Sequence, residues 1–70
     1  MEQVEFELKG EYIELNKLLK VLALVATGGE AGMVIQDGLV SVDGQRATEK
    51  RKKIRKGNTV EFESFKITVV

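Results

Sequence analysis

The sequence predicts an α+β fold in which two helices lie between an N-terminal strand and a run of C-terminal strands. Three observations predict it: apolar residues alternate with polar ones near the N-terminus, recur at helical spacing between residues 15 and 35, and alternate again from residue 40. Alternation is typical of half-buried strands, and recurrence every three or four residues is typical of amphipathic helices. The order β-α-α-β-β-β-β, with no repeat or low-complexity segment, predicts a single domain over residues 1–70.

The first two elements should be a strand and a helix. Val4, Phe6 and Leu8 alternate with charged residues, and Gly10 follows, which predicts a strand with one buried face. Leucines at positions 15, 18, 19 and 22, with an alanine at 26, recur at helical spacing. They predict a first helix over residues 14–26 with a wide apolar stripe.

A short glycine-containing segment should separate this helix from a second one. We expect Thr27, Gly28 and Gly29 to end the first helix, because glycine readily takes the left-handed conformation found after helix C-termini. Glu30 suits the first turn of the next helix, where a carboxylate meets the positive end of the helix dipole. Its inward face should hold Ala31, Val34 and Ile35, and it should end at residues 37–38.

Four strands are predicted in the C-terminal half, beginning with a hairpin. Val40 and Val42 alternate with polar residues up to Asp43-Gly44, a dipeptide typical of two-residue hairpin turns. The returning strand should cover residues 45–50.

Two further strands should follow a Lys-Gly-Asn turn at residues 56–58. Apolar residues at positions 60 and 62 alternate with glutamates in the first of them. After a tight reversal at Ser64-Phe65, the second should cover residues 66–70 and bury Ile67 and Val69.

The summed charge of the chain is zero, but the charges are segregated along it. Residues 46–56 contain seven cations and one acid, a net charge of +6, whereas residues 1–14 contain five glutamates and one lysine, a net charge of −4. Clustered lysine and arginine neutralise phosphates whatever the base sequence. The basic segment therefore predicts a phosphate-binding protein, with a flexible loop made basic for solubility as the alternative.

The residue types also exclude several functions. The chain has no cysteine, which excludes disulfides. It also has no histidine, so a structural zinc site would need carboxylates alone, which zinc rarely uses. Asp37 and Asp43 flank a strand and could be imagined as a carboxylate pair for metal binding or acid–base catalysis. Each has a simpler local role, at a helix end and in a hairpin turn. No phosphate-binding loop motif follows Gly28-Gly29, and no nucleophile and base pair is evident. We therefore predict no enzymatic activity and no cofactor.

The expected location is the cytoplasm. The sequence begins with an acidic segment instead of the basic start of a signal peptide. The longest apolar cluster, residues 18–26, is interrupted by Lys20 and is far shorter than the ~20 residues of a membrane span. We expect no membrane association, and a monomer is favoured.

Five segments together carry a family resemblance: LNKLLK at 15–20, EA at 30–31, VI at 34–35, GLVSVDG at 38–44 and IRKGNTVEF at 54–62. This pattern resembles the S4 domain, the small RNA-binding module of ribosomal protein S4, pseudouridine synthases and tyrosyl-tRNA synthetases. It is most similar to the stand-alone bacterial type exemplified by YbcJ and YaaA. The resemblance implies the S4-like αL fold, with two short helices packed on a small, mainly antiparallel sheet.

The resemblance also implies binding of structured RNA, such as ribosomal or transfer RNA, and a possible association with the ribosome or another ribonucleoprotein. S4 domains bind RNA through the two helices and the adjoining hairpin. Many have cations at the positions of Glu14, Gly28, Gly32 and Ser41, so part of the helical surface is missing here. We predict RNA-binding residues in helix 1 and the basic segment: Lys17, Lys20, Arg46, Lys50, Arg51, Lys52, Lys53, Arg55 and Lys56.

The aromatic residues favour a folded RNA over a single strand. Phe6 and Phe62 should point inward. Tyr12 and Phe65 lie outside clear periodicity and could be exposed, but ordinary packing is favoured for both. The alternative function is a protein-interaction module. It would dock through the acidic N-terminal strand or through exposed apolar residues of helix 1 at positions 21 and 24.

Overall fold

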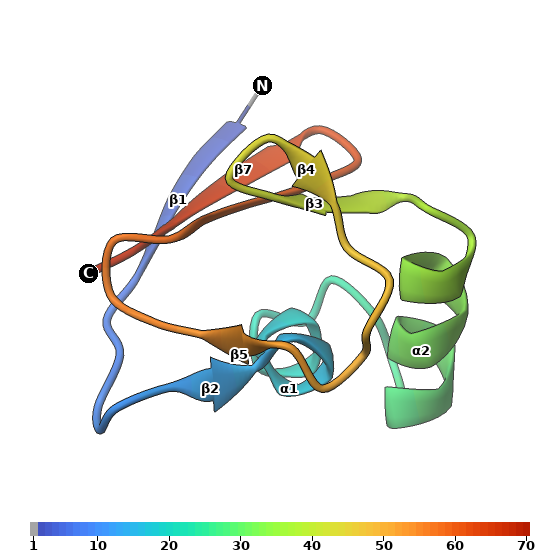
Figure 1. Cartoon of the computed structure of the whole chain (residues 1–70), viewed down its shortest axis with the longest axis horizontal. Coiled ribbons are helices and arrows are strands. Elements are labelled where there is room, and N and C mark those ends of the chain that lie inside the picture. Colours follow the sequence, from blue (N-terminus) through green and yellow to red (C-terminus); the bar gives the residue numbers. More distant parts are fainter. Residues whose placement is uncertain (1) are drawn as a thin grey trace.

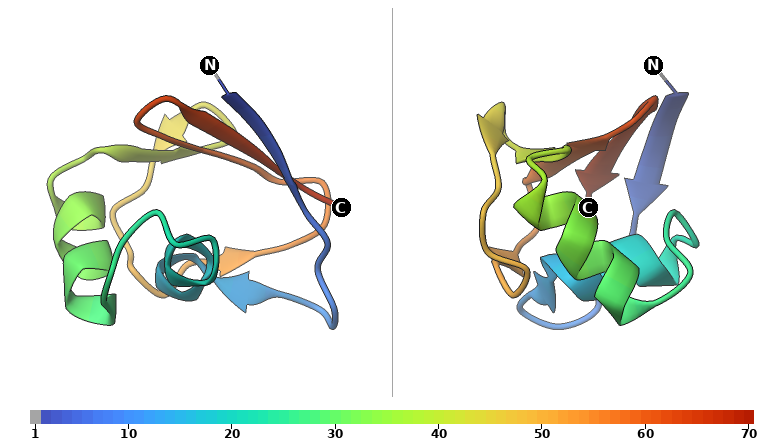
Figure 2. Two further views of the ribbon diagram at one scale, coloured as in Figure 1. Left: turned by 180° about the vertical axis from the view of Figure 1, so that it is seen from behind. Right: turned by 90° about the vertical axis from the view of Figure 1, so that its right-hand side faces the viewer.

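A computed structural model describes residues 2–70, which form two layers (Figure 1). One layer is a five-stranded sheet, and the other contains both helices and a two-stranded ribbon. Figure 2 places the two helices on the same side of the sheet, which confirms the predicted αL arrangement. In chain order the elements are β1 (Glu2–Phe6), β2 (Ile13–Glu14), α1 (Leu15–Val21), α2 (Gly28–Gln36), β3 (Val40–Val42), β4 (Gln45–Arg46), β5 (Lys53–Ile54), β6 (Thr59–Phe62) and β7 (Phe65–Val69).

The sheet is mainly antiparallel, as predicted, with the strand order β1-β7-β6-β3-β4. Its exception is the parallel pair β1 and β7, which sets Glu2 opposite Phe65 and Phe6 opposite Val69. The strand predicted up to Leu8 ends at Phe6. Leu8 is nevertheless buried, and its amide donates to the carbonyl oxygen of Val70 at 2.8 Å.

Side chains from both layers meet in one core. Phe62 is buried and Phe6 is half-buried against the core, so both phenylalanines point inward as predicted. The largest fully buried side chains come from α1, α2, β3, β5, β6 and β7: Leu15, Leu18, Leu19, Ile35, Val40, Ile54, Val60, Ile67 and Val69. Two helices too short to be stable alone are therefore held by tertiary packing.

The first C-terminal hairpin has the predicted turn. Asp43 and Gly44 both have positive φ, 52° and 83°, as a two-residue turn of the I′ type requires. Its returning strand, predicted over residues 45–50, is limited to β4. Ala47 is buried and still donates to the Val40 carbonyl oxygen at 2.9 Å, but the chain then leaves the sheet toward α1.

The first helix ends five residues earlier than predicted, and a glycine does not end it. Ala23 takes the left-handed conformation with φ 59°. Its amide donates to the Lys20 carbonyl oxygen at 3.0 Å, and the Leu24 amide donates to the Leu19 carbonyl oxygen at 3.0 Å. These two hydrogen bonds form a Schellman motif. The prediction that Thr27, Gly28 and Gly29 end this helix was therefore wrong.

Gly28 and Gly29 instead open α2. Thr27 is the N-cap, and its Oγ1 accepts a hydrogen bond from the Glu30 amide at 3.1 Å. Glu30 Oε1 in turn accepts a hydrogen bond from the Ala26 amide at 2.7 Å. The two side chains thus provide acceptors for two backbone amides around the start of α2. At the other end, Gly38 has φ 76°, which confirms the predicted helix end.

The inward face of α2 is the predicted one. Ala31 and Ile35 are buried, and Val34 is half-buried against the core. Neither helix in the described residues has the length and apolar character needed to cross a bilayer.

The last hairpin turns one residue earlier than predicted. Glu63 and Ser64 form the turn, and Phe65 already pairs with Phe62 as the first residue of β7. Ile67 is buried as predicted.

Candidate nucleic-acid interface

The ribbon β2–β5 was not predicted, and it organises the basic segment. Ile13 pairs with Ile54, and Glu14 pairs with Lys53. Ile54 is fully buried and Ile13 packs against the core. Because side chains alternate across a strand, Lys53 lies on the outer face of the ribbon, with Arg55 two residues further on.

The loop between β4 and β5 lies against the start of α1. The Leu15 amide donates to the Lys52 carbonyl oxygen at 2.9 Å, and the Asn16 amide donates to the Lys50 carbonyl oxygen at 2.9 Å. The first amides of a helix have no partner within the helix, so the loop carbonyls supply one. These hydrogen bonds hold the cations of the loop beside Lys17, which lies in the first turn of α1.

All nine predicted cations are exposed, but they do not form one cluster. The structure gathers most of them where the β4–β5 loop, the ribbon and α1 meet. We call this set the basic surface: Lys17, Lys50, Arg51, Lys52, Lys53 and Arg55. Lys20 lies one turn further along α1, and Lys56 lies in the turn before β6.

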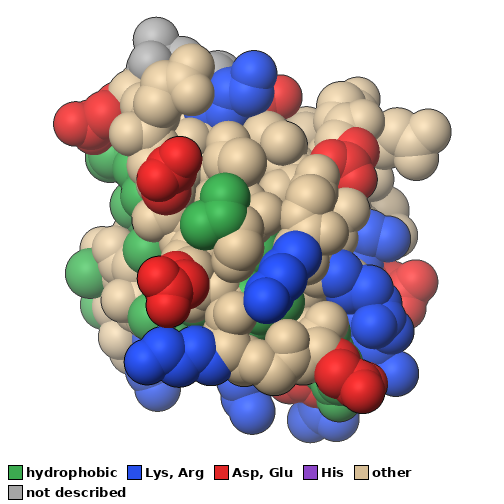
Figure 3. All heavy atoms as spheres, turned by 90° about the vertical axis from the view of Figure 1, so that its left-hand side faces the viewer, with side chains coloured by type: hydrophobic (Ala, Val, Ile, Leu, Met, Phe, Trp, Pro, Cys, Tyr) green, Lys and Arg blue, Asp and Glu red, His purple; other side chains and the backbone are tan. Residues whose placement is uncertain are grey.

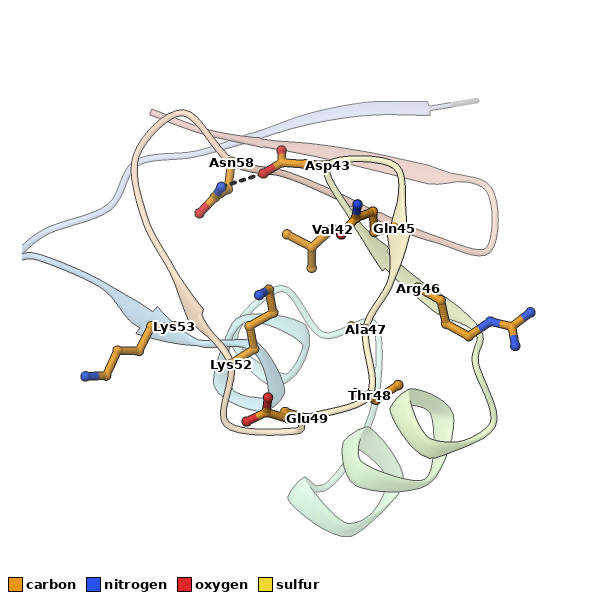
Figure 4. A pocket seen from close by; sticks show the side chains of 10 residues that line it. All are labelled: Val42, Asp43, Gln45, Arg46, Ala47, Thr48, Glu49, Lys52, Lys53 and Asn58. Atoms are coloured by element: carbon orange, nitrogen blue, oxygen red, sulfur yellow. Dashed lines mark hydrogen bonds between the residues drawn. The ribbon is translucent and has the colours of Figure 1, made fainter.

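Arg46 stands apart from the basic surface. Its Cδ and Nε atoms lie 2.9 Å from the position that a Cβ atom on Gly38 would take, so the side chain covers the turn after α2. Figure 4 shows it pointing away from Lys52 and Lys53. A cation near a helix C-terminus interacts favourably with the helix dipole, so this position of Arg46 is favourable for α2.

A hollow of about 240 Å³ lies between the β3–β4 hairpin and the β4–β5 loop (Figure 4). Lys52 points into it, but Asp43 and Glu49 also line it. Asp43 accepts hydrogen bonds from Asn58 Nδ2 at 2.7 Å and from the Thr59 amide at 2.9 Å. Its carboxylate therefore ties two turns together, in addition to its predicted place in the hairpin.

The charges of the basic surface are largely free of carboxylate partners. Within residues 2–70 the single ion pair joins Lys17 Nζ to Glu14 Oε1 at 4.0 Å. Lys17 is 70% exposed, and such pairs contribute little. On the face seen in Figure 3, cations gather along the lower and right-hand margins, while acidic side chains are spread over the face.

Comparison with known proteins identifies the family. The S4 domain model matches residues 6–70. The chain belongs to the S4 domain family. It is 40% identical over 62 residues to the Escherichia coli K12 protein named "Putative RNA-binding protein YbcJ", covering 89% of each chain. It has the same identity and coverage with YbcJ of Shigella flexneri.

A solved structure agrees with the family match. The solution structure of Escherichia coli YbcJ superimposes with a TM-score of 0.73 and 40% identity, covering 96% of this chain and 86% of that one. That structure is described as revealing an αL motif involved in RNA-binding. The predicted family and fold are thus confirmed.

In this S4 domain a lysine from the loop reaches a helix position that lacks a cation. A Cβ atom on Gly32 would lie 3.6 Å from Lys50 Cδ, so the Lys50 side chain runs alongside α2. Gly32 is one of the positions where the resemblance implied a cation in many S4 domains. The Lys50 side chain of the β4–β5 loop thus lies beside this position of α2.

Sequence reasoning misplaced Tyr12, for which ordinary packing was favoured. Tyr12 is 42% exposed, with Lys53 Nζ 4.9 Å and Arg55 Cζ 5.8 Å from its ring centroid. The alternation Tyr12-Ile13-Glu14 was the available signal, because Ile13, which packs against the core, turns its two neighbours outward. Phe65 is half-buried, in line with packing.

The apolar docking site of the alternative function is smaller than predicted. Val21 is 63% exposed at the end of α1, but Leu24 lies beyond the helix and is half-buried against the core. The acidic side chains Glu2 and Glu5 of β1 are exposed.

Proposed function

We propose that this S4 domain binds structured RNA through the basic surface, by contacts to phosphates and without catalysis. The observation that carries the proposal is the seating of the β4–β5 loop on the first amides of α1. It brings the exposed loop cations next to Lys17, and Lys17 is the one cation of the basic surface that has a carboxylate partner within the described residues. Clustered cations of this kind supply sequence-independent affinity for nucleic acid.

The relatives support the choice of RNA. The name of Escherichia coli YbcJ and the description of its structure both refer to RNA binding, and that protein is 40% identical to this chain. Helical RNA presents its phosphates and 2′-hydroxyl groups more readily than its base edges. A folded RNA such as ribosomal or transfer RNA therefore fits a surface rich in cations. The protein would bind this RNA in the cytoplasm, within a ribonucleoprotein.

The nine predicted cations are assigned different weights in this proposal. The basic surface makes the central contacts, and Lys20 extends them along α1. Lys50 also covers the α2 flank beside Gly32. Lys56 and Arg46 lie at the margins, and Arg46 contributes least because its side chain covers the turn at Gly38.

Filter binding of a hairpin RNA across a salt series tests the proposal. The logarithm of the affinity should fall linearly with the logarithm of salt concentration, with a slope of about −0.7 to −0.9 for each phosphate contacted. A flat response would contradict the electrostatic mechanism.

A matched pair of double variants locates the surface. Arg51→Ala with Lys52→Ala removes two cations of the basic surface, and Lys9→Ala with Lys66→Ala removes two cations outside it. The first variant should reduce the size of the salt slope by about 1.4 to 1.8, and the second should leave it unchanged. Equal effects would indicate attraction by overall charge instead of a defined surface.

A further inference from the structure

Tyr12 places an aromatic ring beside Lys53 and Arg55 of the basic surface. It is the chain's one tyrosine, and the chain has no tryptophan. Tyr12 is 42% exposed, whereas the three phenylalanines are buried or half-buried. Tyrosine combines a large apolar ring with a polar hydroxyl group, which suits a partly exposed position in an interface. The ring is therefore accessible to a bound ligand.

The ribbon fixes the position of this ring. Ile13 and Ile54 pair and turn inward, so the preceding Tyr12 and the following Arg55 lie across from each other on the outer side. Lys53 Nζ lies 4.9 Å and Arg55 Cζ 5.8 Å from the ring centroid. Both distances are within the range of cation–π attraction, which holds the ring among the cations.

We propose that Tyr12 stacks on an unpaired nucleobase of the bound RNA. Lys53 and Arg55 would neutralise the phosphates beside that base. A shallow hollow lined by Tyr12, Ile13, Glu14 and Lys17 adjoins the ring and gives the base room. Every base has an aromatic face, so stacking adds affinity without selecting a sequence.

This inference rests on the proposed function and narrows the class of RNA that the domain would bind. A paired stem offers phosphates to the basic surface, but its bases are stacked on one another and cannot reach Tyr12. The ligand class is therefore RNA in which an unpaired nucleotide adjoins a stem, at a bulge, a loop or a strand end. Proteins that recognise RNA commonly stack such splayed bases on aromatic side chains.

The tyrosine itself supplies a direct probe. Because Tyr12 is the one tyrosine and tryptophan is absent, intrinsic fluorescence of the protein reports on this ring. Two hairpin RNAs should be compared, one with a fully paired stem and the other with one bulged adenine in the same stem. We expect the bulged RNA to quench the fluorescence strongly and to bind more tightly than the paired one.

Substitution of Tyr12 separates stacking from other effects. Tyr12→Ala should weaken binding of the bulged RNA by about 5- to 150-fold and leave binding of the paired RNA unchanged. Tyr12→Phe retains the ring and should keep the preference, whereas Tyr12→Leu retains apolar bulk and should lose it. Melting temperatures of all three variants should stay close to that of the parent, which shows that they fold.

Each other outcome has a definite meaning. If the parent binds both RNAs equally and Tyr12→Ala changes neither affinity, the stacking inference is wrong, and salt-dependent binding of both RNAs leaves the proposed function standing. If the parent binds neither RNA, both proposals fall. If Tyr12→Leu retains the preference for the bulged RNA, the contact is apolar and stacking is excluded.

Discussion

The five-stranded sheet and the two-stranded ribbon β2–β5 are built alike but used differently. Each buries one face, yet β1 and β7 share five paired positions while the ribbon has two. The edge strand of the sheet exposes Glu2 and Glu5, whereas the ribbon exposes Lys53 and is flanked by the exposed residues Tyr12 and Arg55. The difference teaches that the large sheet, whose strands follow a periodic pattern, is separate from the small ribbon that carries part of the candidate interface.

The substitution with the largest expected effect tests whether the ribbon and the sheet share one core. Ile54→Ala in β5 should lower the free energy of unfolding by about 2–5 kcal/mol, because it leaves a cavity at a fully buried site. Urea unfolding measures it, with Ile67→Ala in the sheet as the matched variant. A loss well below that of Ile67→Ala would mean that the ribbon is only attached to the surface.

A second prediction tests whether the exposed cations of the basic surface serve binding and not stability. Replacing Arg51, Lys52 and Lys53 together by alanine should reduce affinity for a hairpin RNA on the order of 100-fold near physiological salt. The melting temperature should change little, because exposed charges contribute little to stability. Filter binding and thermal unfolding measure the two effects, and unchanged binding would move the site elsewhere.

A third prediction concerns the α2 flank of the basic surface. Gly32→Lys should raise stability by about 0.5–1 kcal/mol, because glycine is unfavourable inside a helix. Its Cβ atom would meet Lys50 Cδ at 3.6 Å, an ordinary contact. The new cation should also raise RNA affinity about fivefold.

Gly32→Ala is the control for that variant, and it should raise stability alone. Melting temperature and affinity should be measured on both variants. A loss of affinity in both would show that RNA approaches the α2 backbone at this glycine.

The last prediction concerns stability alone and lies at the end of α1, the helix on which the β4–β5 loop rests. Ala23 is held at φ 59°, a conformation that costs alanine more than glycine. Ala23→Gly should raise the free energy of unfolding by about 0.5–1 kcal/mol. Thermal unfolding measures this gain, and a loss would show that the alanine methyl group contributes packing that outweighs the strain.

The sequence predicted the features that depend on local patterns. The Asp43-Gly44 turn, the end of α2 at Gly38 and the alternating strands were confirmed because each is encoded by neighbouring residues. The end of α1 was misjudged because an alanine takes the position that glycine usually fills. Its Schellman hydrogen bonds leave no compositional signal.

The candidate interface was predicted as a set of cations but not as an arrangement. The ribbon has two residues in each strand, too few for a periodic pattern. The Lys50 side chain lies beside Gly32, and the Lys52 carbonyl oxygen accepts a hydrogen bond from the Leu15 amide. Both contacts join parts of the chain that are distant in sequence, so no local pattern predicts them. The alternation around Tyr12 indicated an outward side chain, but the cations beside its ring depend on the pairing of the ribbon.

The parallel pairing of β1 with β7 has a consequence for folding. Glu2 lies opposite Phe65, so this pair closes nearly the whole chain into a loop, and contacts between such distant residues form slowly. We expect β1 to dock last and to show the fastest hydrogen exchange in the sheet. Until it docks, β7 is an open edge rich in apolar residues, prone to pairing with another chain. Once β1 has docked, it forms this edge itself, and the repulsion between its exposed glutamates keeps the edges of two copies apart.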